Sequence, residues 1–146
     1  MNSEILQKFS GKDKINAVFL GGSITQGCGA SEQSKCFANM TGEWLKTEFG
    51  NDRLNYYNMG IGGTPSKYGL IRFKRDVVSY KPHMVFIEFA VNDKGEDTRQ
   101  YVEGLVRGLQ SLPTKPYVVF LYTTDEEYNV NDQILTWKIV TSIQNH

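Results

Sequence analysis

Short apolar runs alternate along this chain with longer segments of helical periodicity. The apolar runs have strand length and occupy residues 15–20, 54–59, 84–91 and 117–122. Apolar side chains recur at helical spacing in residues 35–49, 64–80, 97–112 and from about 132 onward. Repeated strand–helix units predict a parallel sheet covered by helices on both faces, with right-handed crossovers. We therefore expect an α/β protein with a flavodoxin-like three-layer α/β/α sandwich.

Capping residues mark the ends of the predicted helices. Ser34 can cap the start of the first, Gly50 fits just past its end, and Thr64 followed by Pro65 is suited to the start of the second. The apolar positions of the successive helices are Phe37, Met40, Trp44, Leu45 and Phe49; Tyr68, Ile71, Val77 and Val78; Val102, Leu105, Val106, Leu109 and Leu112; and Ile134, Trp137, Val140 and Ile143. These side chains are expected to pack on the sheet.

The chain has the size and uniform composition of one domain. Its 146 residues contain no repeat, low-complexity tract or linker. Residues 1–14 form a polar lead-in with one short helix expected at 3–9, and residues 15–146 form the domain. The pattern stops shortly after a fourth crossover helix has begun. We therefore expect a fold truncated before its fifth strand.

Three of the predicted strands end in residues suited to chemistry. The run from residue 16 to 25 ends in a glycine pair with Ser23 at the tip of the turn. The segments at 58–65 and 85–93 likewise lead from a strand into a glycine-rich loop and into Asn92. Because the carboxyl ends of parallel strands meet at one edge of a sheet, where open α/β folds place their chemistry, these residues are expected to gather there.

These three segments resemble the first three sequence blocks of the SGNH hydrolases, also called GDSL-type lipases and esterases, over roughly residues 14–122. That family uses a Ser nucleophile, a Gly amide and an Asn side chain as oxyanion donors, and a late Asp-x-x-His pair. The resemblance implies that Ser23 is the nucleophile, and that the N–H groups of Ser23 and Gly63 and the side chain of Asn92 form the oxyanion hole. It implies a small-molecule or carbohydrate ester as substrate, and neither a cofactor nor a metal. It also implies that the strands of the sheet lie in the order 2-1-3-4-5.

The sequence departs from the family pattern at two motif positions, and it lacks the Asp-x-x-His pair that supplies the family's catalytic base. Gly22 stands where the name motif has Asp, and Ala90 where many members have Gly, both variants expected in a branch that acts on carbohydrate esters. No Asp-x-x-His occurs in the chain. His83 precedes the third strand, roughly 25–30 Å from Asn92 at about 3.3 Å per residue, and a base must come within about 3 Å of the serine hydroxyl. His146 ends a helix that runs away from the active edge, so the catalytic base is predicted to lie outside this chain.

Composition excludes several other functions. Sixteen acidic and sixteen basic residues give no electrostatic basis for binding nucleic acid or an anionic membrane. No apolar run has membrane-spanning length, and the N-terminus lacks the apolar stretch of a signal peptide, so a cytoplasmic location is the default expectation, subject to the chain being a fragment. Cys28 and Cys36 are too few for a disulfide framework or a zinc site.

Three alternatives remain beside the esterase interpretation. A nucleotide-binding domain would also place glycine-rich turns after strands, but neither phosphate-binding glycine pattern occurs. Cys28 could act as a thiol nucleophile, although it lies past the turn and has no basic neighbour in sequence. The third alternative is a catalytically inactive ester- or carbohydrate-binding remnant that keeps the oxyanion pocket without the base. Finally, an unpaired, apolar fourth strand predicts self-association through this edge.

Overall fold

The computed structural model describes residues 7, 9–11, 14–95 and 97–123. Its elements, in chain order, are β1 (Ile15–Gly21), α2 (Ser23–Gln26), η1 (Gln33–Lys35), α3 (Phe37–Phe49), β2 (Leu54–Gly60), α4 (Ser66–Ile71), α5 (Phe73–Asp76), η2 (Val78–Tyr80), β3 (Met84–Glu88), α6 (Thr98–Ser111) and β4 (Tyr117–Phe120). The predicted helix at 3–9 lies mostly outside the described residues, of which Gln7 and Phe9 are helical. The helix expected from residue 132 and His146 also lie outside them.

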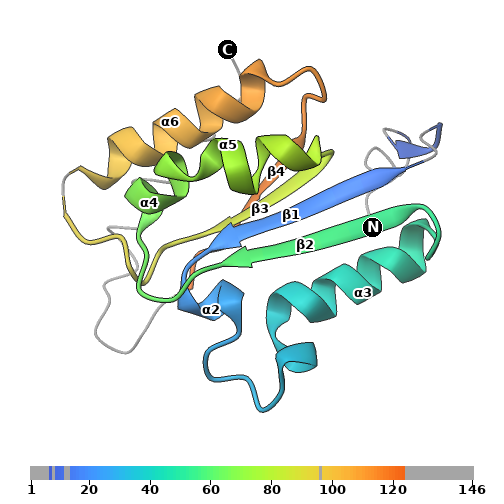
Figure 1. Ribbon diagram of the computed structural model, residues 1–146, viewed down its shortest axis with the longest axis horizontal. Helices are drawn as coiled ribbons and strands as arrows, with labels where there is room; N and C mark the ends of the chain where they lie inside the picture. Colours follow the sequence, from blue (N-terminus) through green and yellow to red (C-terminus); the bar gives the residue numbers. More distant parts are fainter. Residues whose placement is uncertain (1–6, 8, 12–13, 96, 124–146) are drawn as a thin grey trace.

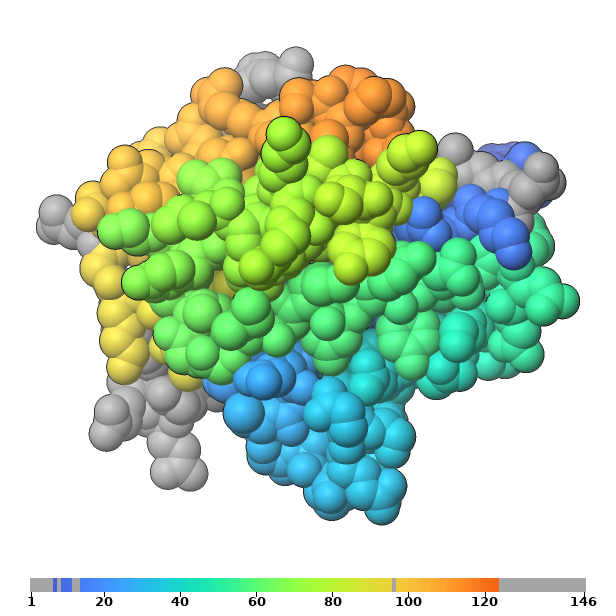
Figure 2. All heavy atoms as spheres, viewed as in Figure 1, coloured from blue at the N-terminus to red at the C-terminus, as the bar shows by residue number. Residues whose placement is uncertain are grey.

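The described strands form one parallel sheet in the order β2-β1-β3-β4. This order is the one expected for the first four strands. In Figure 1, α2 and α3 lie on one side of the sheet and α4, α5 and α6 on the other. The three-layer α/β/α fold is therefore confirmed. Residues of β2, α4 and α5 make up much of the face shown in Figure 2.

Alternate side chains of β1 build the two halves of the core, as the pleat of a buried strand requires. Phe19 points to the α3 side, where its ring stacks on Phe86 with centroids 4.5 Å apart. Val18 and Leu20 point to the other side, against Leu105 of α6. Both faces of β1 are buried, which explains its near-continuous apolar run.

The helix α3 packs on the sheet through a different stripe from the one predicted. Leu45 and Phe49 are buried as expected, but Met40 and Trp44 are 57% and 48% exposed. Gly42 faces the sheet instead, so close to the Tyr56 ring that an added Cβ would lie 2.4 Å from it. The predicted Ser34 cap is also wrong, because Cys36 occupies the N-cap position. Gly50 follows the helix with φ of 102°, as expected.

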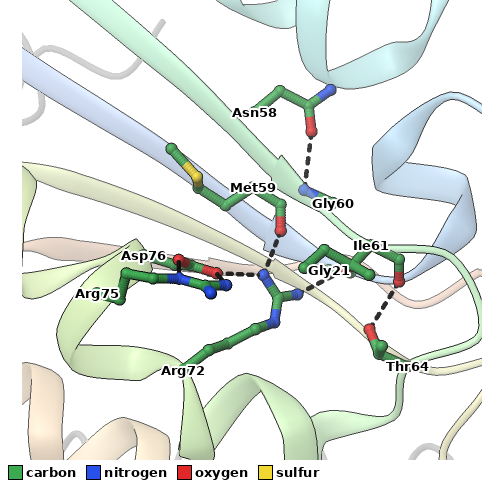
Figure 3. A network of polar contacts seen from close by, with 9 residues as sticks. All are labelled: Gly21, Asn58, Met59, Gly60, Ile61, Thr64, Arg72, Arg75 and Asp76. Carbon is green, nitrogen blue, oxygen red and sulfur yellow. Dashed lines mark hydrogen bonds and ion pairs between the residues drawn. The ribbon is translucent and has the colours of Figure 1, made fainter.

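The single helix predicted for residues 64–80 is divided into α4, α5 and η2. Pro65 is the N-cap of α4, while the Thr64 hydroxyl donates to the Ile61 carbonyl and not to the helix. Helical geometry breaks at Arg72, where the chain turns so that the guanidinium reaches the sheet (Figure 3). Tyr68 and Ile71 are consequently exposed; Gly69 packs against Phe89 and Val77 is buried.

The third and fourth strands are shorter than predicted. The strand β3 ends at Glu88 and not at residue 91, because the Phe89 carbonyl accepts the N–H groups of both Asn92 and Asp93, at 2.9 Å each, and closes a turn. The strand β4 ends at Phe120 and not at residue 122. The helix α6 agrees closely with its predicted range of 97–112, and four of its five predicted core positions are buried, namely Val102, Leu105, Val106 and Leu109.

The strand β4 is an outermost strand of the described sheet, and pairing along this strand with a second chain is expected to drive self-association. Tyr117 is 40% exposed, and the segment from 117 to 120 carries no charge or proline to block pairing with a second chain. Light scattering over a concentration series should show an apparent mass that rises with concentration. Tyr117→Lys, which places a charge on the edge, should lower it. A strictly monomeric chain with a cooperative melt would contradict this prediction.

Candidate active site

The carboxyl ends of β1, β2 and β3 meet at one edge of the sheet. Gly21 at the end of β1 pairs in register with Gly60 of β2 and with Glu88 of β3. The residues that follow these three strands therefore emerge side by side. They include Ser23 after β1, the loop at 61–65 after β2, and the turn at 89–92 after β3.

Ser23 is the first residue of α2, a single helical turn directly after β1. The Gly22 N–H donates to the Glu88 carbonyl at 3.1 Å, and the Gly22 carbonyl accepts the Gln26 N–H at 3.0 Å. These contacts fix the turn on both sides of Ser23. Ser23 as a residue is half-buried at the rim.

The side chain of Asn92 lies over the Gly22 backbone. A Cβ added at Gly22 would lie 2.6 Å from Asn92 Oδ1 and 3.3 Å from the Thr64 carbonyl. A side chain at position 22 would require the Asn92 carboxamide to shift, and with glycine there the carboxamide lies next to the Ser23 turn. The turn after β3 brings Asn92 there, a contact that the longer predicted strand would not make.

The loop after β2 is held by polar side chains on both sides. Gly62 donates its N–H to Gln26 Oε1 at 2.7 Å, and Gly60 donates to Asn58 Oδ1 at 3.0 Å. Gly63 has a φ of 71°, and a Cβ added there would have no atom within 4 Å. Among the described residues, no acceptor binds the Gly63 N–H. The Thr64 N–H likewise has no acceptor among the described residues, so two neighbouring amides of this loop, those of Gly63 and Thr64, are free to meet a ligand.

The Gly62 backbone lies close to the serine. A Cβ built on Gly62 would be 3.8 Å from the Cβ of Ser23. The structure therefore brings the loop that carries Gly63, the Asn92 side chain and Ser23 together at one edge of the sheet. Sequence reasoning missed Asn58 and Gln26, whose side chains hold the loop, since single polar residues near a strand end give no distinctive pattern.

The buried carboxylate of Glu88 holds the helical turn α2 in place. Glu88 is 2% exposed, and its two oxygens accept hydrogen bonds from the Thr25 hydroxyl at 3.1 Å and the Thr123 hydroxyl at 2.8 Å. Thr25 lies in α2, two residues after Ser23. Glu88 thereby ties this helical turn to the segment that follows β4, another contact that the sequence pattern does not reveal.

Asp93 serves the fold at this edge. Its Oδ1 accepts the Ser66 N–H at 2.7 Å, so it caps α4 from a distant part of the chain. Burial raises the pKa of Asp93, the Ser66 N–H opposes that shift, and the nearby Glu88 carboxylate adds to it. Asp93 therefore caps a helix, while the side chain of the adjacent Asn92 lies next to Gly22.

The two other candidate groups lie away from this cluster. His83 lies just before β3, at the end of the sheet opposite to Ser23, and this agrees with its predicted placement. Its Nδ1 accepts the Asn16 N–H at 3.1 Å. Cys28 is exposed in the loop after α2. Within the described part of the chain, no three His, Cys, Asp or Glu side chains are grouped closely enough to hold a metal ion. No helix there is long and apolar enough to cross a membrane.

A parallel doubly wound sheet with a serine, a free backbone amide and an asparagine at its carboxyl edge defines a class of α/β proteins with a potential acyl-transfer site. Residues 19–139 match the sequence model of the GDSL-like lipase/acylhydrolase family, so the chain belongs to this family. The family resemblance inferred from the sequence is confirmed. No curated protein matches the chain significantly.

Solved structures agree with this assignment. A two-domain esterase active on acetylated mannans has a TM-score of 0.75 and 39% identity, and the match covers 82% of this chain and 32% of that one. TesA has a TM-score of 0.75 at 18% identity, covering 89% of this chain and 74% of that chain. AlinE4, an SGNH-hydrolase family esterase, has a TM-score of 0.60 at 21% identity, covering 73% and 58%. The chain thus spans about a third of the mannan esterase, and the last two likenesses support the fold alone.

Proposed function

We propose that this chain carries the nucleophile and oxyanion hole of a serine ester hydrolase that acts on acyl or carbohydrate O-acetyl esters. The observation that carries the proposal is the convergence of Ser23, the free Gly63 amide and the Asn92 side chain at one edge of the sheet. The 39% identity to an esterase active on acetylated mannans supports the carbohydrate ester as substrate.

In this proposal the Ser23 hydroxyl attacks the ester carbonyl carbon while a base takes its proton. The carbonyl oxygen becomes an oxyanion, which the N–H groups of Ser23 and Gly63 and the Asn92 carboxamide stabilise. The N–H of Ser23 suits this role because the first N–H groups of a helix lack intrahelical acceptors. Collapse of the intermediate expels the alcohol and leaves an acyl group on Ser23, which water then removes. No cofactor takes part.

A base supplied in solution tests this proposal. With 4-nitrophenyl acetate, the chain alone is expected to react little faster than Ser23→Ala, because His83 contacts Asn16 at the far end of β3 and the sequence contains no Asp-x-x-His. Added imidazole should raise the rate of the wild type above that of Ser23→Ala, which serves as the background because imidazole itself cleaves this ester. Equal rates for the two proteins with imidazole would contradict Ser23 as nucleophile. Fast turnover without imidazole that depends on His146 would show that the chain holds its own base.

The second candidate function is an inactive ester- or carbohydrate-binding remnant. The absence of Asp-x-x-His from the sequence favours it. Calorimetric titration with an acetylated mannooligosaccharide distinguishes the two functions. Tight binding without release of acetate, with or without imidazole, would support the remnant, whereas acetate release that depends on Ser23 would support the hydrolase.

A further inference from the structure

Arg72 carries a buried positive charge between α4 and the sheet. Its side chain is only 8% exposed. Nη1 donates to the Met59 carbonyl at 2.7 Å and to Asp76 Oδ2 at 2.7 Å, and Nη2 donates to the Gly21 carbonyl at 2.9 Å (Figure 3). One guanidinium therefore binds a carboxylate and two strand carbonyls at once.

The two carbonyls belong to the strands that lead into the candidate active site. Gly21 ends β1 and stands two residues before Ser23, and Met59 stands near the end of β2, four residues before Gly63. The Gly21 carbonyl also accepts the Ile61 N–H at 3.1 Å. The serine turn and the glycine loop are thus joined through one carbonyl oxygen that Arg72 holds in place.

We propose that Arg72 is a positioning residue for the ester hydrolysis proposed above, on which this inference rests. It acts through the ends of β1 and β2, and it fixes the separation of Ser23 from the Gly63 amide. The planar guanidinium can span both carbonyls in a fixed fork, which a lysine ammonium cannot do. Because a displacement of about 1 Å in a catalytic group can cost about 10²-fold in rate, such a cross-link affects catalysis directly.

Arg75 offers a matched control for this role. It also pairs with Asp76, through Nε and Nη2, but its side chain is 72% exposed. Among the described residues, its guanidinium donates to Asp76 and to neither of the two strand carbonyls. The two arginines therefore share a counter-charge and differ in whether they touch the strand ends, so a comparison separates positioning from charge pairing.

The test compares Arg72→Lys with Arg75→Gln in the full chain. With imidazole as base and the Ser23→Ala rate subtracted, Arg72→Lys should lower kcat per folded molecule by about tenfold or more, with KM changed less than about twofold. The Ile61 amide should exchange its hydrogen about tenfold faster in this variant, because its acceptor carbonyl is no longer held. Arg75→Gln should match the wild type in both measurements. Wild-type kcat and Ile61 exchange in Arg72→Lys would overturn the proposal, as would a loss explained entirely by unfolded protein.

The wild-type protein supplies a measurement that needs no variant. The nitrogen-15 NMR spectrum should show separate, slowly averaging signals for the two Nη groups of Arg72, whereas those of Arg75 should average to one. A single averaged Arg72 signal would overturn the cross-link even if Arg72→Lys failed to fold. If Ser23→Ala kept the full rate while Arg72→Lys still accelerated Ile61 exchange, the proposed hydrolysis would fail, and the cross-link would persist without the catalytic role assigned to it.

Discussion

Asn92→Ala is expected to lower kcat by about 10²–10³ with little change in KM, because an oxyanion donor acts mainly on charge that develops in the transition state. The measurement requires a protein that contains all of the catalytic residues. It should therefore be made in an extended protein, in which these residues are followed by an Asp-x-x-His segment of the kind that the family uses. The Asn92 side chain makes no hydrogen bond with the residues that the structure describes, so its removal should leave the melting temperature almost unchanged.

Two companion variants make the Asn92 result specific. Asn92→Asp keeps the shape of the side chain but replaces a donor by a negative charge, so its loss in kcat should be at least as large. His83→Ala should stay near the wild type, because His83 contacts Asn16 at the opposite edge of the sheet. An unchanged kcat in Asn92→Ala would reduce Asn92 to a turn residue, and a large loss in His83→Ala would contradict the placement of that histidine.

Asp76→Ala is expected to lower the free energy of unfolding by about 3 kcal/mol at neutral pH. Asp76 is 5% exposed and accepts hydrogen bonds from Arg72 and Arg75, so its loss leaves the Arg72 charge buried without a counter-charge. The value lies at the low end for a broken buried pair because two carbonyls still bind Arg72. Urea unfolding followed by circular dichroism measures this difference, and Arg75→Gln, at an exposed position, should have nearly the wild-type midpoint.

The effect of Asp76 should depend on pH in a defined direction. The Arg75 hydrogen bond, together with Arg72, holds the pKa of Asp76 below its usual value, and burial opposes this only in part. A carboxyl with a lowered pKa stabilises the fold above its unfolded pKa of about 3.9 and loses that contribution as the pH falls through its folded pKa. The difference between wild type and Asp76→Ala should therefore shrink below about pH 4. A difference that is constant with pH would show that packing, and not charge, is what Asp76 supplies.

The parallel sheet and the end of it that bears the candidate site could be predicted from sequence patterns that span many residues, and the strand order from the resemblance to the family. Continuous apolar runs mark buried parallel strands, and the chain positions of Ser23, Gly63 and Asn92 directly after such runs imply a shared edge. The catalytic roles of these three residues stay predictions, and so do the domain boundary at residue 15 and self-association through β4.

Other features depend on single contacts that no sequence pattern indicates. The break at Arg72 arises from one guanidinium reaching two carbonyls, although periodicity in this region favours a continuous helix. The exposure of Met40 and Trp44 follows from Gly42, whose missing side chain lets α3 approach Tyr56. Apolar character therefore indicates which residues could be buried, whereas the smallest residues decide which face of a helix comes closest to the sheet.

Gly22 and Asn92 are seventy positions apart in the sequence, yet they share one small volume of the fold. With Asn92 Oδ1 only 2.6 Å from where a Gly22 Cβ would lie, a larger residue at position 22 would require the carboxamide to shift. The family's name motif combines Asp at this position with the same Asn, so a side chain is compatible there once the carboxamide moves. Glycine at position 22 thus bears on where the Asn92 carboxamide lies, and a substitution at a residue with no side chain of its own would change the position of a proposed oxyanion donor.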